Sequence, residues 1–169
     1  MAAFDDLTTT LGALGKRQLY RRRRVVESPP GREIVVGGRR LLNFCSNDYL
    51  GLAADPRVCA AFKAGVDPWG AGAGASHLVS GHTSAHEELE EALADFTGRP
   101  RALLFGSGYA ANLGAINALL GPGDHVFEDR LNHASLLDGG WLSRAHFTWF
   151  AHADPADLEA GLAGCDESS

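Results

Sequence analysis

The sequence predicts an α/β domain in which parallel strands alternate with helices. From residue 83 onward, apolar residues at helical spacing alternate with short apolar segments of strand length, a pattern typical of right-handed parallel crossovers. A glycine-rich turn at 106–108 joins one predicted strand directly to a helix. With 45% apolar and 21% charged residues the chain can bury a core, which excludes a disordered tail, a collagen-like repeat and a disulfide-dense miniprotein.

The first part of the chain is predicted to form a helix and a hairpin. Apolar residues recur at roughly helical spacing over residues 4–24, and this segment ends in the basic run Arg21–Arg24. Such a run is typical of a solvated helix end, and the alternative is that it binds an acidic group of a substrate. Residues 33–36 and 39–42 flank Gly37-Gly38, which suits a two-residue hairpin turn.

Two segments without any period interrupt this pattern. Residues 43–52 are polar and aromatic, and residues 69–81 are rich in glycine. Irregular segments of this kind carry binding and catalytic residues more often than the elements that they join. We therefore expect both to be functional loops.

The elements after residue 83 are predicted from caps, apolar faces and stop signals. They are a helix with the capping box Ser84–Glu87 that ends at Gly98, a buried strand at 102–105, a helix from 108 to near 121, a strand at 126–127, a helix from about Asn132, a strand at 147–150, and a helix from Pro155 to Gly164. Three parallel strands make a small sheet. The sequence ends at Ser169, where another strand is expected, so we expect the N-terminal portion of a larger α/β protein.

The turn at 106–108 is the strongest candidate for an anion site. The first N–H groups of the following helix lack intrahelical acceptors, and the helix dipole adds partial positive charge there. Small residues let a phosphate come close. The turn does not have the spacing of GxGxxG, of GxxxxGK[ST] or of the GxSxG nucleophile elbow. A tight turn without a ligand is the alternative.

His133 follows the next predicted strand and stands at the head of its helix. Because ligands of α/β proteins bind at the carboxyl ends of the strands, we expect His133 to lie at the same sheet edge as Gly108. A histidine there can stack on a planar ring or form hydrogen bonds near neutral pH. The alternative is a solvated or capping residue.

Composition and spacing disfavour several other functions. A net charge of −6 disfavours nucleic-acid binding. Cys45, Cys59 and Cys165 form no CxxC pair or disulfide framework. His82 and His86 lack the glutamate of HExxH, so no metal site is predicted. No apolar run reaches the roughly 20 residues of a membrane span, and the N-terminus lacks a secretory signal, so we expect a cytoplasmic protein without a membrane partner.

Four segments together resemble the α-oxoamine synthase family of pyridoxal 5'-phosphate (PLP) enzymes. In family order they are Asn43–Gly51, Gly70–Gly81, Leu103–Asn112 and Asp129–Leu137. The resemblance implies an α/β, fold-type I PLP-dependent transferase of aspartate aminotransferase-like architecture that is active as a homodimer. It also implies that residues 1–52 form an N-terminal helix, hairpin and active-site loop segment, and that residues 53–169 form the first part of the large PLP-binding domain.

The resemblance assigns roles to individual residues. It implies that the backbone of Gly108 and Tyr109 holds the cofactor phosphate, and that His133 stacks on the pyridine ring and faces the substrate. Arg21 would contact the acyl substrate or its product, and Asn47, in the loop beside the site, would also bind substrate. The implied reaction is a decarboxylative condensation of an amino acid with an acyl thioester.

The chain also departs from the family pattern. Ala75 and His77 stand where many relatives have glycine and arginine. Neither Lys16 nor Lys63 lies in a motif that matches the PLP lysine, so no catalytic residue is assigned, and that lysine is expected downstream together with an aspartate and a second histidine. The 169-residue chain alone is therefore expected to be inactive. The alternative is a chain that binds a phosphate or dimerises without catalysing.

Overall fold

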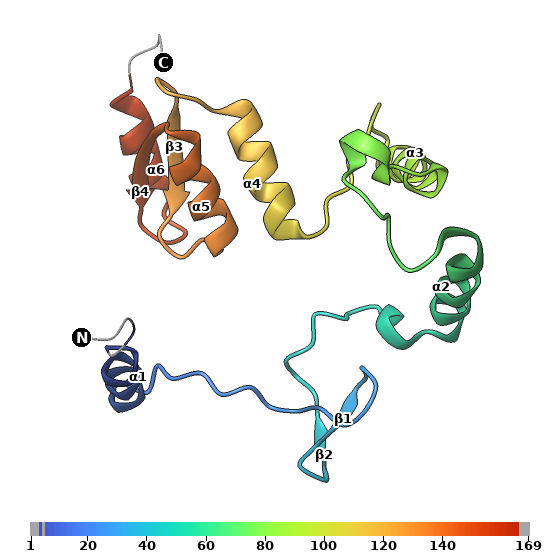
Figure 1. Ribbon diagram of the computed structural model, residues 1–169. Coiled ribbons are helices and arrows are strands. Elements are labelled where there is room, and N and C mark those ends of the chain that lie inside the picture. Colours follow the sequence, from blue (N-terminus) through green and yellow to red (C-terminus); the bar gives the residue numbers. More distant parts are fainter. Residues whose placement is uncertain (1–3, 5, 166–169) are drawn as a thin grey trace. The chain divides into compact units, whose positions relative to one another are not determined.

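The computed structural model describes residue 4 and residues 6–165, which form two compact units, Met1–Ala73 and Gly74–Ser169 (Figure 1). The division at residue 52 that the family resemblance implies stays a prediction. The residues just before Ser169, on which the expectation of a further strand depends, lie outside the described part.

The first helix is shorter than the sequence predicts. α1 spans Leu7–Lys16, whereas residues 4–24 are expected to be helical. Gly12 and Gly15 weaken the helix, and Gln18 has a φ of +57°, in the left-handed region that ends it. Arg21–Arg24 consequently lies in an exposed irregular segment and is not a helix end.

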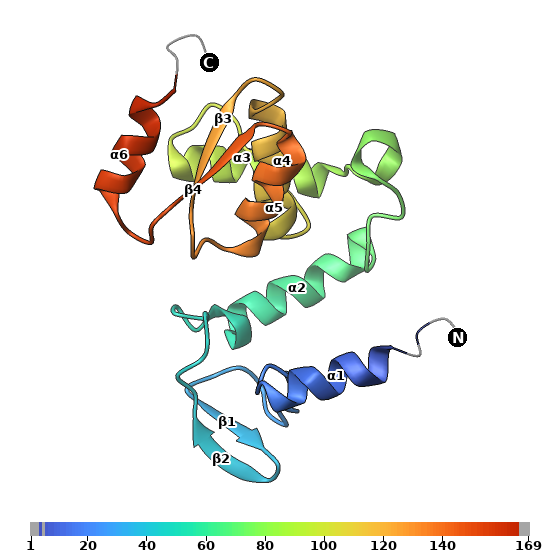
Figure 2. The same ribbon diagram turned by 90° about the vertical axis from the view of Figure 1, so that its left-hand side faces the viewer.

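The predicted hairpin is confirmed. β1 (Glu33–Val36) and β2 (Arg39–Leu42) pair antiparallel, with Val36 opposite Arg39 (Figure 2). The turn residues Gly37 and Gly38 have φ values of +56° and +70°. A two-residue turn of this type requires positive φ at both positions, which glycine adopts without steric cost.

A second helix of this unit was not predicted. α2 (Pro56–Trp69) follows the short 3₁₀ turn η1 (Leu52–Ala54). Asp55 caps it, because its carboxylate accepts a hydrogen bond of 2.8 Å from the N–H of Arg57, and Pro56 occupies the first helical position. The Asp-Pro start and apolar residues four apart were signals for this helix in the sequence.

The second unit begins with a wide π-helical turn, η2 (His77–Gly81), within the predicted loop, followed by α3 (Ser84–Thr97). The predicted capping box Ser84–Glu87 is wrong by one residue. Thr83 is the N-cap, and its N–H donates to Nδ1 of His86 over 3.2 Å, so an imidazole replaces the expected carboxylate. The helix ends at Gly98 as predicted, with a φ of +63°.

Among its described residues, this unit has a sheet of two strands instead of the expected three. β3 (His125–Asp129) and β4 (His146–Phe150) pair in parallel. The predicted strand at 102–105 has no ladder partner among the described residues, and the N–H of Leu104 donates instead to Glu90 of α3 over 2.8 Å. A strand needs a neighbour for its backbone groups, and an apolar run by itself does not supply one.

One helix contacts each strand of this sheet, and a third helix packs on one of these two. α4 (Gly108–Leu119) packs on α5 (Ala134–Ser143), α5 contacts β3, and α6 (Pro155–Ala163) contacts β4 (Figure 1). Glycine makes the close approach of α4 and α5 possible, since a Cβ on Gly139 would lie 2.7 Å from Cδ1 of Ile116.

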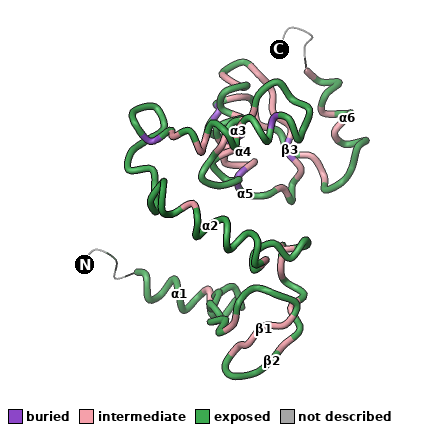
Figure 3. Tube along the Cα trace, turned by 90° about the vertical axis from the view of Figure 1, so that its right-hand side faces the viewer, coloured by how far each residue is buried: buried purple, intermediate pink, exposed green. Residues whose placement is uncertain are grey.

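Little of the tube in Figure 3 is coloured as buried. Ala94 is the one buried hydrophobic residue of the described part, whereas large apolar side chains such as Phe96 and Leu119 are 87% and 80% exposed. No described helix combines the length and apolar character that a membrane crossing requires.

Candidate functional site

The start of α4 offers two free backbone donors. Ser107 is the N-cap, and its Oγ accepts a hydrogen bond of 3.1 Å from the N–H of Ala110. Gly108 and Tyr109 occupy the first two helical positions, where an N–H cannot reach an intrahelical acceptor. Within the described part of the chain no other group accepts from these two N–H groups. Both donors are therefore available to an anion at the positive end of the helix.

The glycines of this turn are not explained by packing. A Cβ on Gly106 or Gly108 would meet no heavy atom within 4 Å, and neither residue has a positive φ. This contrasts with Gly139, where a side chain would collide with α4. The backbone of Gly106 and Gly108 is therefore open to the close approach of a ligand.

Tyr109 links the start of α4 to α5. Its hydroxyl donates a hydrogen bond to Asp138. This hydrogen bond raises the pKa of Tyr109 above its ordinary value, and burial and the negative charge of Asp138 act in the same direction. The phenol is therefore held in its neutral form, with its ring tied to α5.

His133 is the N-cap of α5, which agrees with its predicted position at the head of this helix. Its Nδ1 accepts from the N–H of Ser135 over 3.2 Å and lies 2.7 Å from Oγ of the same serine. That Oγ also accepts a hydrogen bond of 3.0 Å from Nδ2 of Asn112. The structure thus connects His133 to α4, the helix that begins at Gly108.

The other two predicted site residues belong to the first unit. Arg21 and Asn47 are both exposed and lie outside helices and strands. The carbonyl of Asn47 accepts a hydrogen bond of 2.9 Å from the N–H of Tyr49. The substrate-binding roles that the family resemblance implies for Arg21 and Asn47 stay predictions.

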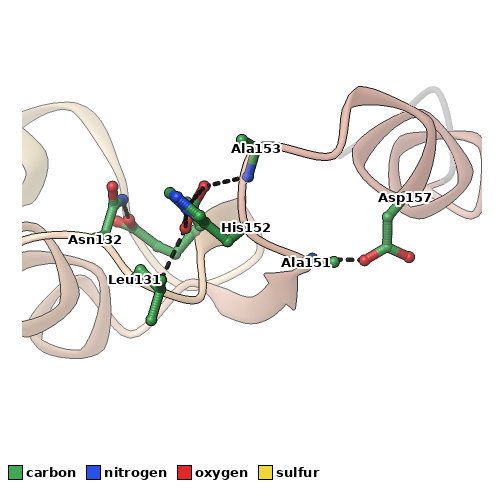
Figure 4. A network of polar contacts seen from close by, with 8 residues as sticks. Leu131, Asn132, Ala151, His152, Ala153 and Asp157 are labelled. Atoms are coloured by element: carbon green, nitrogen blue, oxygen red, sulfur yellow. Dashed lines mark hydrogen bonds and ion pairs between the residues drawn. The ribbon is translucent and has the colours of Figure 1, made fainter.

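The segment that leads to His133 is fixed by two acidic residues at the end of β3. The carboxylate of Asp129 accepts from the N–H groups of Ala153 and Leu131 at 2.9 and 2.7 Å and from Nδ1 of His152 at 2.9 Å (Figure 4). These donors, the backbone N–H groups first, lower the pKa of Asp129 from 3.8 to about 2.

Glu128, the buried residue before Asp129 in β3, holds the same segment. Its carboxylate accepts a hydrogen bond from the side chain of Asn132, the residue before His133. Asp129 also joins the loop after β3 to the loop after β4. The segment before His133 is therefore held by hydrogen bonds to both carboxylates.

One histidine and two glutamates come together around the start of α3. His82, Glu87 and Glu90 each place one potential ligand atom within 4.8 Å of the others. Two of the three residues are exposed, and Nε2 of His82 already pairs with Glu87 at 2.9 Å. Because His82 and Glu87 already pair with each other, we assign no metal ion to this group.

Three residues of the site were not predicted from the sequence: Asn112, Ser135 and Asp138. Asn112 and Ser135 lie within segments that carry the family resemblance, which is the one signal that could have drawn attention to them. Their contacts join two helices, and local spacing contains no information on such contacts.

The chain is similar to known proteins over most of its length. The profile of a family described as aminotransferase class I and II matches residues 39–169. Among curated proteins, the 8-amino-7-oxononanoate synthase of Methylococcus capsulatus is 61% identical over 158 residues, which are 94% of this chain and 41% of that protein. The enzyme of the same name from Pseudomonas putida is 61% identical over 157 residues, 93% of this chain and 40% of the relative. The chain thus spans about two fifths of the length of these relatives.

Solved structures show the same likeness. The serine palmitoyltransferase of Sphingomonas wittichii matches with a TM-score of 0.85 and 33% identity, over 98% of this chain and 42% of that one. A serine palmitoyltransferase from S. paucimobilis with a bound PLP–myriocin aldimine matches with a TM-score of 0.85 and 32% identity, over 97% and 43%. An 8-amino-7-oxononanoate synthase from Francisella tularensis matches with a TM-score of 0.61 and 31% identity, over 73% and 34%.

Proposed function

We propose a function for this chain, which belongs to the class I and II aminotransferase family, since the profile of that family matches residues 39–169. The predicted fold-type I, aspartate aminotransferase-like architecture is confirmed by the structural matches, and the resemblance to α-oxoamine synthases is confirmed by the curated relatives.

We propose that the complete protein is an 8-amino-7-oxononanoate synthase. The observation that carries this proposal is the 61% identity to proteins of that name over almost the whole chain. Such an enzyme joins L-alanine to pimeloyl-CoA, or to a pimeloyl-carrier protein, with loss of CO₂ in biotin biosynthesis. It would act as a cytoplasmic homodimer, without nucleic-acid or membrane partners.

The start of α4 fits the phosphate of PLP. No group in the described part of the chain accepts from two N–H donors there, and the space beside Gly106 and Gly108 is open. When bound, PLP supplies an electron sink for carbanion chemistry. Gly108 and Tyr109 would hold its phosphate through charge-assisted hydrogen bonds from the backbone, and His133 would stack on its pyridine ring.

The remaining roles concern the substrates. The guanidinium of Arg21 suits the terminal carboxylate of a pimeloyl chain, because its fork of donors matches a carboxylate. Asn47 is proposed to lie beside the substrate. Lys16 and Lys63 lie in no motif that matches the PLP lysine, so covalent chemistry is assigned to no residue of this chain.

Other functions compete with this proposal. The segments 129–139 and 74–82 resemble 8-amino-7-oxononanoate synthase most, while 2-amino-3-ketobutyrate CoA ligase and 5-aminolevulinate synthase have similar segments. The TM-score of 0.85 to serine palmitoyltransferase adds a fourth member of the family to this set. A chain without catalytic activity is the alternative of a different class.

A substrate comparison tests the proposal. The protein at its natural length, loaded with PLP, is assayed for CoA release with L-alanine and pimeloyl-CoA. Controls replace L-alanine by glycine or L-serine, and pimeloyl-CoA by palmitoyl-CoA or short acyl-CoAs. We expect the fastest release with L-alanine and pimeloyl-CoA. Preference for another pair would assign another member of the family, and no release with any pair would support the non-catalytic alternative.

A further inference from the structure

Ser135 and Asn112 form a connected pair of polar side chains next to His133. Ser135 is fully buried, with an exposed fraction of 0%, whereas His133 is exposed. Oγ of Ser135 has a partner on each side: Nδ2 of Asn112 at 3.0 Å and Nδ1 of His133 at 2.7 Å. A buried hydroxyl needs such partners, and here both belong to one chain of hydrogen bonds.

The donors around Nδ1 determine which nitrogen of the ring carries hydrogen. The backbone N–H of Ser135 can only donate, and it lies 3.2 Å from Nδ1 of His133. Nδ1 must therefore accept, and in the neutral ring the hydrogen is on Nε2. Because Asn112 already donates to Oγ, the hydroxyl hydrogen of Ser135 is free to donate to the same Nδ1. Two donors thus converge on one nitrogen.

The pair spans two helices whose close approach depends on Gly139. Asn112 lies on α4 and Ser135 on α5, and a side chain on Gly139 would collide with Ile116 of α4. Further along the same contact, Nδ2 of Asn117 donates to the carbonyl of Gly139 over 3.3 Å. The helix that starts at Gly108 is thereby connected to the imidazole of His133.

We propose that Asn112 and Ser135 are positioning residues that hold His133 in one orientation as the Nε2–H tautomer. They direct two donors at Nδ1, so that Nε2–H is the ring group left for a ligand bound at the start of α4. The proposal rests on the proposed function only for the identity of that ligand: PLP with its amino-acid substrate, which Nε2–H would face while the imidazole stacks on the pyridine ring. The tautomer itself follows from hydrogen bonds within this chain.

The tautomer can be measured without activity, by nitrogen NMR of the protein at its natural length with ¹⁵N-labelled histidine. We expect His133 to show hydrogen on Nε2 and an accepting Nδ1. Ser135→Ala removes one of the two donors to Nδ1, and the ratio of the tautomers should shift about fivefold toward Nδ1–H, as the loss of one ordinary hydrogen bond predicts.

A second variant changes polarity with little change of shape. In Asn112→Asp the carboxylate only accepts, so the Ser135 hydroxyl donates to it and no longer to His133. This variant should also shift the ratio about fivefold, since it removes the same donor. The control is Asn117→Ala, which removes an amide from the same helix that reaches the carbonyl of Gly139 and not Ser135, and it should leave the ratio unchanged.

Three outcomes would overturn the proposal: hydrogen on Nδ1 in the parent protein, an unchanged ratio in both test variants, or an equal shift in the Asn117→Ala control. Failure of the proposed function looks different. In that case the ratios would change as expected, but added PLP would produce no bound-cofactor absorbance in the parent protein.

Discussion

Replacement of Gly108 by proline tests the anion site directly. Gly108 is the first residue of α4, a position that favours proline because an N–H there has no intrahelical acceptor. The preceding Ser107 is extended, with φ −164° and ψ 159°, close to the conformation that a residue before proline prefers. The substitution should therefore remove one N–H donor while α4 stays in place.

The magnitude follows from the lost hydrogen bond. A hydrogen bond to a charged group contributes about 1.5–3 kcal/mol, so PLP binding should weaken about 10- to 150-fold. Gly108→Ala is the matched control, because it keeps the N–H and its Cβ meets no protein atom within 4 Å. Absorbance titration of both variants at natural length gives the Kd of PLP, and thermal unfolding without PLP checks that the fold is retained.

The reasoning would be refuted if both variants bound PLP as tightly as the parent protein and had equal thermal stability. In that case the N–H of Gly108 would not bind the cofactor phosphate. Equal losses in both variants would show that the space beside Gly108 decides binding, and that its hydrogen bond does not.

Three further predictions concern activity, pH and association. His133→Ala should slow turnover and alter the absorption spectrum with L-alanine, with a fall of only a few degrees in Tm because the side chain is exposed at a helix start; unchanged rates and spectra would leave it as an N-cap alone. Since the pKa of Asp129 is lowered from 3.8 to about 2, its stabilising effect should be complete above about pH 4 and be lost as the pH falls toward 2, and urea unfolding should show a flatter pH dependence for Asp129→Asn. The 169-residue chain by itself should self-associate in light scattering, because side chains such as Phe96 and Leu119 are exposed, and should release no CoA with L-alanine and pimeloyl-CoA; a monomeric or active chain would contradict this.

Features encoded by a few neighbouring residues could be predicted from the sequence. Gly37-Gly38 identifies the hairpin because a two-residue turn of this type needs positive φ at both positions, which two glycines adopt readily. Asp154 and Pro155 identify the start of α6, where the aspartate accepts from the N–H groups of Ala156 and Asp157. Gly98 identifies the end of α3 for the same kind of local reason.

Features that depend on competition between local signals were predicted less well. The helix expected over residues 4–24 ends early, because apolar spacing does not outweigh Gly12, Gly15 and the left-handed Gln18. The segment 102–105 has the apolar character of a strand, but strand formation requires a hydrogen-bonded neighbour, which no local sequence feature supplies.

The candidate site shows the same division. The positions of Gly108 and His133 at helix starts could be predicted, because caps, glycines and apolar periods are local properties of the chain. The contacts of Asn112 with Ser135, 23 residues further along the sequence, and of Tyr109 with Asp138 depend on how the helices pack. Those contacts exist because Gly139 lets α4 and α5 approach closely, and the distance between two helices is a property of their packing, which neither helix's own sequence specifies.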